Sequence, residues 1–251
     1  MNKKTIYMAL AASVLLTACG GSSSSSKAND GKGDIDFKQY FPNASMTKTF
    51  ISTDRDGDDI NKSHYDEIVN VNGETITYTK DTKIVRKVVF TDKNITTTYT
   101  EDNKTEVNSV FRHIDLGDII FSNKESRIQN NALGRITATL NQVCKVKSKE
   151  EKFEKGDNIY TGDLLKIECI TDGKIFYDIK QDILDAGLGL DLNGTHNIYN
   201  TSYVYMKKDL GVVATIDNDC ITNSKIPGLI NDKASESECI KEQYQYEFYI
   251  P

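Results

Sequence analysis

The sequence of 251 residues carries a formal net charge of -6 and contains 38% hydrophobic residues, which allows one large domain or two small ones. The acidic balance excludes the basic surface that nucleic-acid binding needs, and three histidines make a multi-histidine metal site unexpected. The small net charge per residue and the 13 tyrosines exclude wholesale disorder.

The N-terminal residues 1–18 have the pattern of an export signal. Lys3 and Lys4 precede an apolar run over 6–16. This run is too short to cross the roughly 30 Å of hydrocarbon in a bilayer as a stable helix. The segment is therefore expected to be a signal peptide that is removed on maturation.

The signal ends in Leu-Thr-Ala-Cys at 16–19 and is followed directly by Gly20. This ending resembles the lipobox of bacterial lipoproteins. The resemblance implies cleavage before Cys19 and attachment of lipid to its thiol, and several acyl chains anchor a protein more firmly than one. It also favours the outer membrane, because Gly20 stands where an Asp would retain the protein in the inner membrane. Loss of Lys3 and Lys4 takes the formal charge to -8, so lipid and not charge is expected to hold the protein to its membrane.

The segment that follows, residues 19–34, is rich in Gly and Ser and cannot bury a core. It is expected to be a flexible, lipidated tether with a reach of about 20 Å. The region 35–251 contains no strong break in composition and is expected to form a single β-rich exported domain. Two lobes that meet near 123–134 are the alternative.

The first half of this region has the pattern of an antiparallel meander. The two residues Asn72-Gly73 separate two β-prone runs and predict a hairpin. The runs over 74–79 and 95–100 are rich in Thr, so one face of the sheet is expected to be solvated. Polar breaks at regular spacing predict strands over 47–53, 65–71, 74–79, 84–91, 95–100, 107–114 and 116–122.

The second half continues the β pattern. A strand over 135–140 is expected to run on to Cys144 through a bulge, because Val143 breaks the alternation. Apolar spacing over 178–186 predicts a short helix, and more helix over 123–133 and 222–242 is the alternative. Further strands are predicted over 197–207, 210–217 and 244–250. The expected fold is mainly β: an antiparallel meander, a curved sheet or a partly open barrel with one or two short helices.

Four cysteines remain besides Cys19, and an even number in an exported chain predicts two disulfides. They are Cys144, Cys169, Cys220 and Cys239. Three connectivities are open, and the strand pattern favours Cys144–Cys169 with Cys220–Cys239. If Cys144 lies opposite Cys169 on an antiparallel strand, Val146 falls opposite Ile167 on the same face. The charged segment 147–163 then forms a long hairpin loop.

Three short segments are similar to features of uncharacterised exported bacterial lipoproteins. The resemblance implies a fold class and no chemistry. The segments are Tyr40-Phe41-Pro42, Val143-Cys144-Lys145-Val146 and Asp209-Leu210-Gly211-Val212-Val213.

The acidic segment 54–59 is the candidate metal site, because Ca²⁺ prefers carboxylate and carbonyl oxygens. It resembles the calcium loops of EF-hand-like and thrombospondin-type repeats. The candidate ligands are Asp54, Asp56, Asp58 and Asp59. Ser52 stands at the first ligand position of that pattern and Ser63 at the position of the distal Glu. The alternative is a polar hairpin loop, in which Asp and Gly are favoured turn residues.

No hydrolase or phosphate-binding motif occurs, and no catalytic residue is predicted. Single histidines at His64, His113 and His196 are expected to be structural. Six tyrosines either line a groove or cover a sheet with solvated hydroxyls: Tyr199, Tyr203, Tyr205, Tyr244, Tyr246 and Tyr249.

The sequence therefore predicts a membrane-anchored, non-enzymatic binding or structural module. Its expected partners are the membrane, through the N-terminal lipid, and an envelope protein, a glycan or a hydrophobic ligand, but no nucleic acid. The alternative is a calcium-dependent adhesion or assembly module, with Ca²⁺ as the candidate cofactor at 54–59.

Overall fold

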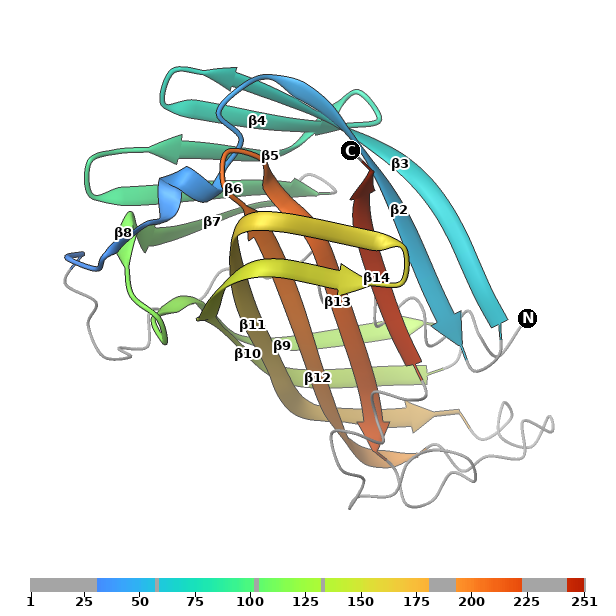
Figure 1. Cartoon of the computed structure of the whole chain (residues 1–251). Coiled ribbons are helices and arrows are strands. Elements are labelled where there is room, and N and C mark those ends of the chain that lie inside the picture. Colours follow the sequence, from blue (N-terminus) through green and yellow to red (C-terminus); the bar gives the residue numbers. More distant parts are fainter. Residues whose placement is uncertain are drawn as a thin grey trace.

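The computed structural model of the protein describes residues 31–56, 59–101, 104–131, 134–180, 193–222 and 243–250. Almost all of these residues lie in strands (Figure 1). The elements are β1 (Ile35–Asp36), η1 (Phe37–Tyr40), β2 (Met46–Asp56), β3 (Asp59–Asn72), β4 (Thr75–Lys80), β5 (Lys83–Phe90), β6 (Asn94–Glu101), β7 (Lys104–Phe111), β8 (His113–Ile114), β9 (Ile119–Asn131), β10 (Gly134–Lys155), β11 (Asn158–Ile179), β12 (Gly194–Lys207), β13 (Gly211–Thr222) and β14 (Gln243–Ile250).

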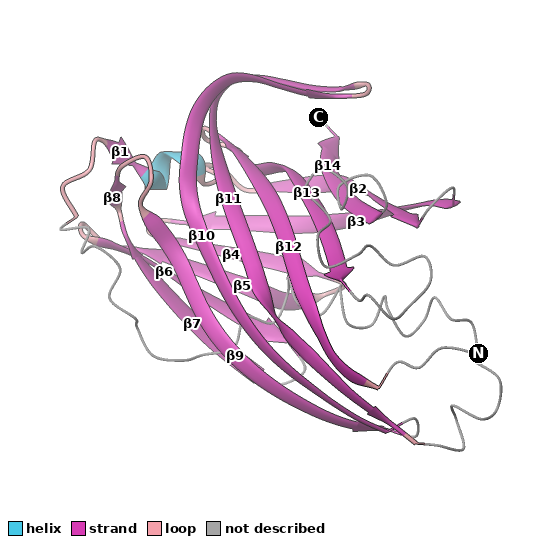
Figure 2. Ribbon diagram, turned by 90° about the horizontal axis from the view of Figure 1, so that it is seen from below, coloured by secondary structure: helices cyan, strands magenta, loops and turns pink. Residues whose placement is uncertain are grey.

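Twelve of the described strands form one curved antiparallel sheet in the order β7-β6-β5-β4-β3-β2-β14-β13-β12-β11-β10-β9. The sheet consists of two meanders, β2 to β7 and β9 to β13, in which strands adjacent in sequence are also adjacent in space. β14 lies between β2 and β13 and joins the two meanders. The sheet bends until its two edge strands approach each other, so the fold is a partly open barrel (Figure 2). The expectation of a mainly β fold is confirmed.

Local alternation explains the meander β2 to β7. The predicted hairpin connects β3 and β4, but its turn is one residue later, at Gly73-Glu74; Gly73 has a φ of 58°, which favours glycine. In β4, Ile76 and Tyr78 are buried on the concave face, and the neighbouring Thr77 is partly exposed on the other face. One face of these strands is therefore solvated, as the Thr-rich pattern indicates.

The concave face of both meanders packs into one apolar core, and the segment before β2 closes one end of it. Phe37 and Tyr40 of η1 are each less than 7% exposed, and the ring of Phe41 contacts that of Phe90 at a centroid distance of 5.2 Å. The larger buried set comprises Ile35, Phe37, Tyr40, Val69, Ile76, Tyr78, Val88, Phe90, Ile95, Ile114, Cys144, Val146, Leu165, Ile167, Cys169 and Met206.

The three segments that carry the similarity to exported lipoproteins meet at this end of the core. The backbone N–H of Asp209 donates to the carbonyl of Gln39 at 2.8 Å. Gly211 has a φ of 80°, and a Cβ at that position would lie 2.9 Å from Cδ of Pro42. Glycine is favoured there both by its backbone conformation and by the close approach of the segment after η1. Cys144 shares the same core.

A two-stranded sheet of β1 and β8 lies beside the same end. Arg112, which precedes β8, donates to both carboxylate oxygens of Asp36, at 2.9 and 2.8 Å. This hydrogen-bonded guanidinium lowers the pKa of Asp36 below its ordinary value. The ion pair therefore stabilises the attachment of β1 and η1 to the sheet at neutral pH.

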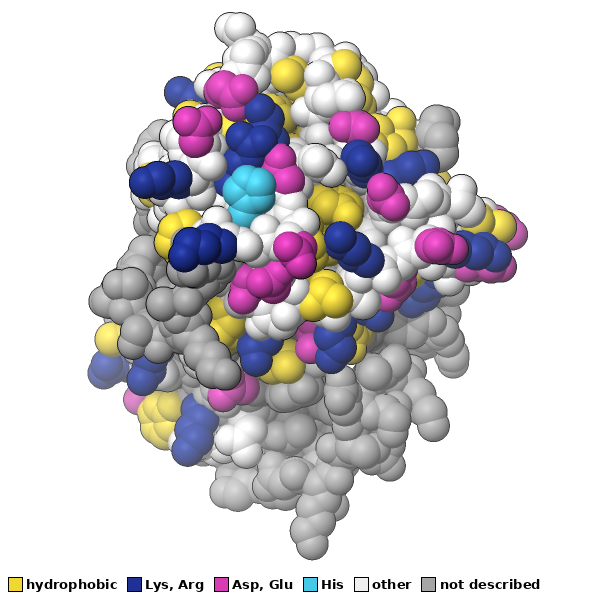
Figure 3. All heavy atoms as spheres, turned by 60° about the vertical axis from the view of Figure 1, so that its left-hand side comes forward, with side chains coloured by type: hydrophobic (Ala, Val, Ile, Leu, Met, Phe, Trp, Pro, Cys, Tyr) yellow, Lys and Arg dark blue, Asp and Glu magenta, His cyan; other side chains and the backbone are white. Residues whose placement is uncertain are grey.

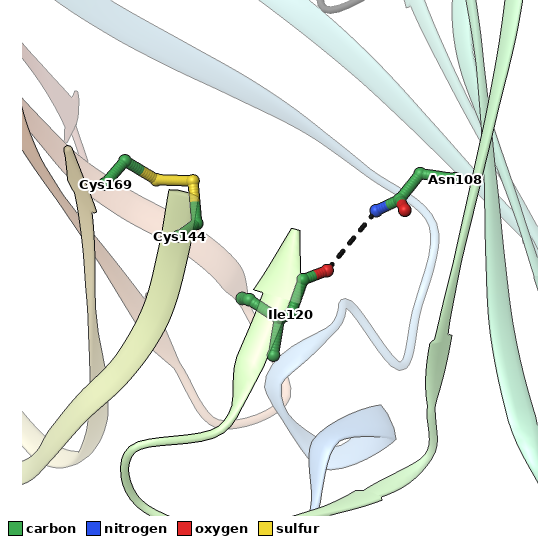
Figure 4. The surroundings of a disulfide bond; sticks show 4 residues. All are labelled: Asn108, Ile120, Cys144 and Cys169. Atoms are coloured by element: carbon green, nitrogen blue, oxygen red, sulfur yellow. Dashed lines mark hydrogen bonds between the residues drawn. A yellow bond between two sulfur atoms is a disulfide. The ribbon is translucent and has the colours of Figure 1, made fainter. Parts of the chain in front are cut away.

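The two edge strands β7 and β9 approach each other closely at one place. There the Asn108 side chain of β7 donates to the carbonyl of Ile120 in β9 at 3.5 Å (Figure 4). No ladder between β7 and β9 occurs among the described strand pairs. The seam of the barrel is thus joined by a side chain and not by paired backbones.

The predicted disulfide between Cys144 and Cys169 is present and links β10 to β11 (Figure 4). The two cysteines are direct partners in the antiparallel ladder, and Val146 is the partner of Ile167, as the pattern predicts. Cys220 lies in β13 opposite Tyr199, whereas Cys239 lies outside the described residues, so the second predicted disulfide stays a prediction.

Three predictions about β9 to β11 are wrong. The segment 147–163 is not a loop, because both strands continue through it to a two-residue turn at Gly156-Asp157. β10 has no bulge at Val143. Its register shifts relative to β9 between Cys144 and Lys145, and relative to β11 between Val146 and Ser148 and between Glu150 and Lys152. The alternative of helix over 123–133 is contradicted, since β9 runs to Asn131. The charged residues of the segment 147–163 do not interrupt β10 and β11, because the two strands remain paired through it.

The predicted helix over 178–186 is wrong at its start. Asp178 and Ile179 are the last residues of β11, paired with Arg135 and Gly134. Residues 181–192 and 223–242 lie outside the described residues, so the remaining helix predictions are not addressed.

Replacing Cys144 and Cys169 together by Ala should lower the free energy of unfolding by about 3–4 kcal/mol. The sequence separation is 25 residues, and closing a loop of this size reduces the entropy of the unfolded chain by about that amount. Urea denaturation of the wild type and the double variant measures the difference. With reductant present in both samples the difference should shrink towards zero; an unchanged difference would contradict the assignment.

Candidate functional site

The predicted lipid attachment site, Cys19, and most of the tether lie outside the described residues. The first described strand begins at Ile35, and the predicted division into signal, tether and exported domain stays a prediction. Within the described part of the chain there is no helix with the length and apolar character needed to cross a bilayer.

The acidic segment 54–59 lies at the tip of the hairpin formed by β2 and β3. In the ladder Asp56 is the partner of Asp59, and Asp54 is the partner of Asn61. Asp58 and Gly57 lie outside the described residues. No group of three potential metal ligands is found among the residues that the structure describes. The side chains of residues 54–60 lie outside the described residues, so the calcium site stays a prediction.

A buried lysine in β2 is the most unusual polar group of the concave face. Lys48 is only 1% exposed, and its Nζ donates to the carbonyl of Leu210 at 3.1 Å and to that of Val212. The rings of Phe50 and Tyr249 flank the ammonium, each with its centroid 5.0 Å from Nζ. Burial lowers the pKa of Lys48 to about 8.

The position of Lys48 explains what the buried amine does. The last described residue of β14 is Ile250, which pairs with Thr49. Near this end of the described ladder, Lys48 satisfies the carbonyl of Leu210, which directly precedes β13, and that of Val212 in β13. The side chain therefore joins the two meanders at the place where the described ladder of β14 ends.

Further charged and phenolic groups lie on the same face of β2, β3 and β5. Glu67 is the ladder partner of Lys48 and accepts a hydrogen bond from Arg86 at 3.3 Å. The hydroxyl of Tyr65 donates to Glu247 at 3.0 Å. Burial raises the pKa of both Tyr65 and Glu247. These groups bind one another across an intervening strand, β2 or β4, which is the arrangement of a structural network.

Sequence reasoning did not find this network. The sequence did contain one indication. Lys48 is two residues from Met46 and two from Phe50, so in a strand it points to the same, buried face as these two residues. A charged residue that alternates in step with core residues indicates a buried polar site more strongly than a charged residue in a turn does. The network was missed because each charge, considered alone, also fits the solvated face of a strand.

The long hairpin of β10 and β11 bends outward and covers the outer side of β12 to β14 (Figure 1). Phe153 of this arm packs against Tyr205 at a centroid distance of 4.0 Å, and the hydroxyl of Tyr160 donates to the carbonyl of Tyr249 at 2.6 Å. Burial raises the pKa of Tyr160 to about 12. An aromatic cluster thus holds the arm against the outside of the sheet.

This arm changes the interpretation of the tyrosine pattern. Tyr205 is 5% exposed, and Tyr203 and Tyr249 are partly buried in the same cluster. These three neither line an open groove nor keep fully solvated hydroxyls. The side chains of Tyr199, Tyr244 and Tyr246 lie outside the described residues. Of the histidines, His64 is exposed in β3, His113 is half-buried in β8, and the side chain of His196 is not described.

The outer face of β3 to β7 is a regular polar surface. Direct ladder partners on this face form two rows across five strands. One row is Asn70–Thr77–Lys87–Thr98–Val107, and the other is Asn72–Thr75–Val89–Thr96–Ser109. All ten residues are at least partly exposed, so this face presents hydroxyl, amide and ammonium groups at the strand spacing of about 4.8 Å.

Charges of both signs are interspersed on the face of the molecule in Figure 3, with hydrophobic side chains between them. No field of one sign dominates that view. Long-range steering of a highly charged partner is therefore not what this face favours.

Comparison of the chain with protein-family models, with curated proteins and with solved structures finds no match.

Replacing Lys48 by Met should remove a specific pH dependence of stability. The folded-state pKa of about 8 lies below the ordinary value of 10.5, so the unfolded chain binds more protons between these values and stability rises with pH there. We expect the free energy of unfolding of the wild type, relative to Lys48→Met, to increase by roughly 1–3 kcal/mol from pH 7 to pH 10. Urea denaturation at both pH values measures this, and a constant difference would contradict it.

Proposed function

We propose that the chain is an envelope lipoprotein, anchored in the outer membrane through lipid on Cys19. Its β domain acts as a non-enzymatic binding module, and the binding surface is the outer face of β3 to β7. The lipobox-like ending at 16–19 and the Gly/Ser-rich segment after it support the anchor.

The packing of the concave face narrows the choice of partner. Among the three partner classes expected, a hydrophobic molecule held against the curved sheet would need free space on that face. Core side chains from both meanders occupy it, and η1 closes one end. A polar partner that binds on the outside, an envelope protein or a surface glycan, agrees better with this packing.

The single observation that carries the proposal is the row Asn70–Thr77–Lys87–Thr98–Val107. All five side chains are at least partly exposed, and the first four present polar groups in a fixed array. A sheet holds such groups more precisely than a loop, which favours a partner with repeating hydrogen-bonding groups.

The anchor is tested by replacing Cys19 with Ser. Without the thiol, no lipid can be attached, so incorporation of radiolabelled palmitate should fall to background. The wild-type chain, expressed and labelled in parallel, is the control. Palmitate incorporation that persists in Cys19→Ser would overturn the anchor.

The binding face is tested by photo-crosslinking in intact cells. A photoreactive residue in place of Thr98 should give an adduct of higher mass than the chain, because this position lies within the polar array. The matched control replaces Lys174, which is exposed on β11 in the other meander. Mass spectrometry of the adduct separates a protein from a glycan. Adducts at position 174 but not at 98, or at neither, would reject the proposed face.

A further inference from the structure

The outer edge of β9 is unpaired along most of its length in the described structure. On one side β9 pairs with β10 from Ile119 to Asn131. On the other side Ile120 meets Asn108 at the seam, and the ladders of the described strands include no further partner for β9. β9 and β10 then run on past the meander that contains β7 (Figures 1 and 2).

This free edge has the properties of a surface for strand addition. From position 122 to 131 it is roughly 30 Å long at the usual rise of a strand. Ser122, Lys124, Ser126 and Asn130 are exposed, and Ile128 is 60% exposed. The segment contains no Pro, and the register shift of the ladder lies at its start, so neither feature blocks pairing further along. An edge that neither Pro nor a bulge interrupts can pair with another strand, and the charges of Lys124, Glu125 and Arg127 restrict which strand that can be.

The sequence of the edge is complementary to itself. In β9 Glu125 and Arg127 are separated by Ser126. Their ladder partners in β10 are Leu140 and Ala138, so the strand that is already paired supplies no opposite charge at either position. A strand added at the free edge would place its own residues opposite them.

We propose that the free edge of β9 binds the same edge of a second copy of this chain, antiparallel, with the two copies of Ser126 opposite each other across the two-fold axis. A two-fold axis that relates antiparallel neighbours is perpendicular to the sheet and keeps the two faces distinct. The axis therefore passes midway between the two copies of one residue, which are direct ladder partners, and this leaves few registers to compare.

Among these registers, the one centred on Ser126 is favoured by charge. It pairs Glu125 of each copy with Arg127 of the other, and opposite charges across a ladder are stabilising. Registers centred on Lys124, Glu125 or Arg127 place two identical charges directly opposite each other, which is destabilising.

The favoured register also matches the remaining positions. On the exposed face it puts Ile128 opposite Lys124, whose aliphatic stem can cover apolar surface. It pairs Ser122 with Asn130 on the same face. The two curved sheets then continue into one another through β9, and the exposed fraction of Ile128 decreases. This inference is independent of the partner proposed for the outer face of β3 to β7.

The register is tested by cysteine crosslinking of the full chain in a Cys19→Ser background. In the proposed dimer the two copies of residue 126 are direct partners, with Cα atoms about 4.5–5.5 Å apart, within the range of a disulfide. Ser126→Cys should therefore give a disulfide-linked dimer on mild oxidation. Ser122→Cys is the matched control, because it lies opposite Asn130, and the background chain measures crosslinking by the native cysteines.

Charge reversal tests the same register by sedimentation equilibrium. Glu125→Arg places like charges opposite each other twice and should weaken dimerisation on the order of tenfold or more. Adding Arg127→Glu to that variant restores opposite charges and should restore the dimer. The unfolding midpoints of both variants show whether they still fold. The crosslinking experiment is independent of these variants, because Ser126→Cys leaves both charges in place.

Three results on the purified protein would overturn the proposal. They are a monomer at all protein concentrations, equal crosslinking at positions 122 and 126, and a dimer that does not respond to Glu125→Arg. Crosslinking of Ser126→Cys in cells to a different protein, without a homodimer, would equally reject self-pairing.

Discussion

Burial of the concave face is the constraint on which the rest of the structure depends. Each meander is apolar on that face, and neither is covered until the other lies against it. The chain closes one end of the core with η1, which the Asp36–Arg112 ion pair fixes beside the sheet. Lys48 joins β2 to β13 across the same interior. With the inside filled in this way, the surfaces that stay accessible are the outer face, the arm and the edges.

The parts of the fold that follow local rules were predictable. Hairpins, solvated faces and the pairing of Cys144 with Cys169 all follow from alternation between neighbouring segments. The place of β14 between β2 and β13 did not, because pairing of Tyr249 with Phe50 joins residues far apart in sequence and leaves no local pattern. The arm over 147–163 was predicted to be a loop because it is rich in charged residues. Its aromatic residues, which attach it to the sheet, were given no weight. No single segment of the sequence shows which distant segment it pairs with or packs against.

The candidate sites divide in the same way. Cys19 was predicted from a local motif and the acidic tip at 54–59 from composition, whereas the buried network around Lys48 can be recognised only from the register of β2, β3, β5 and β14. The polar rows on β3 to β7 were foreseen only as a solvated Thr-rich face; their alignment into an array appears when the ladders are known. The free edge of β9 could not be predicted either, because the sequence of a strand does not show which other strands lie beside it.

The position of β14 has a consequence for the order of assembly. It comes last among the described strands, and its eight residues pair with both meanders. Each meander can form from local hairpins as the chain emerges, but joining them requires a long-range closure that is slow compared with hairpin formation. Until then two apolar sheet faces are exposed to water and to other chains. A chain that stops before Gln243 would keep them exposed, so this late strand decides between folding and aggregation.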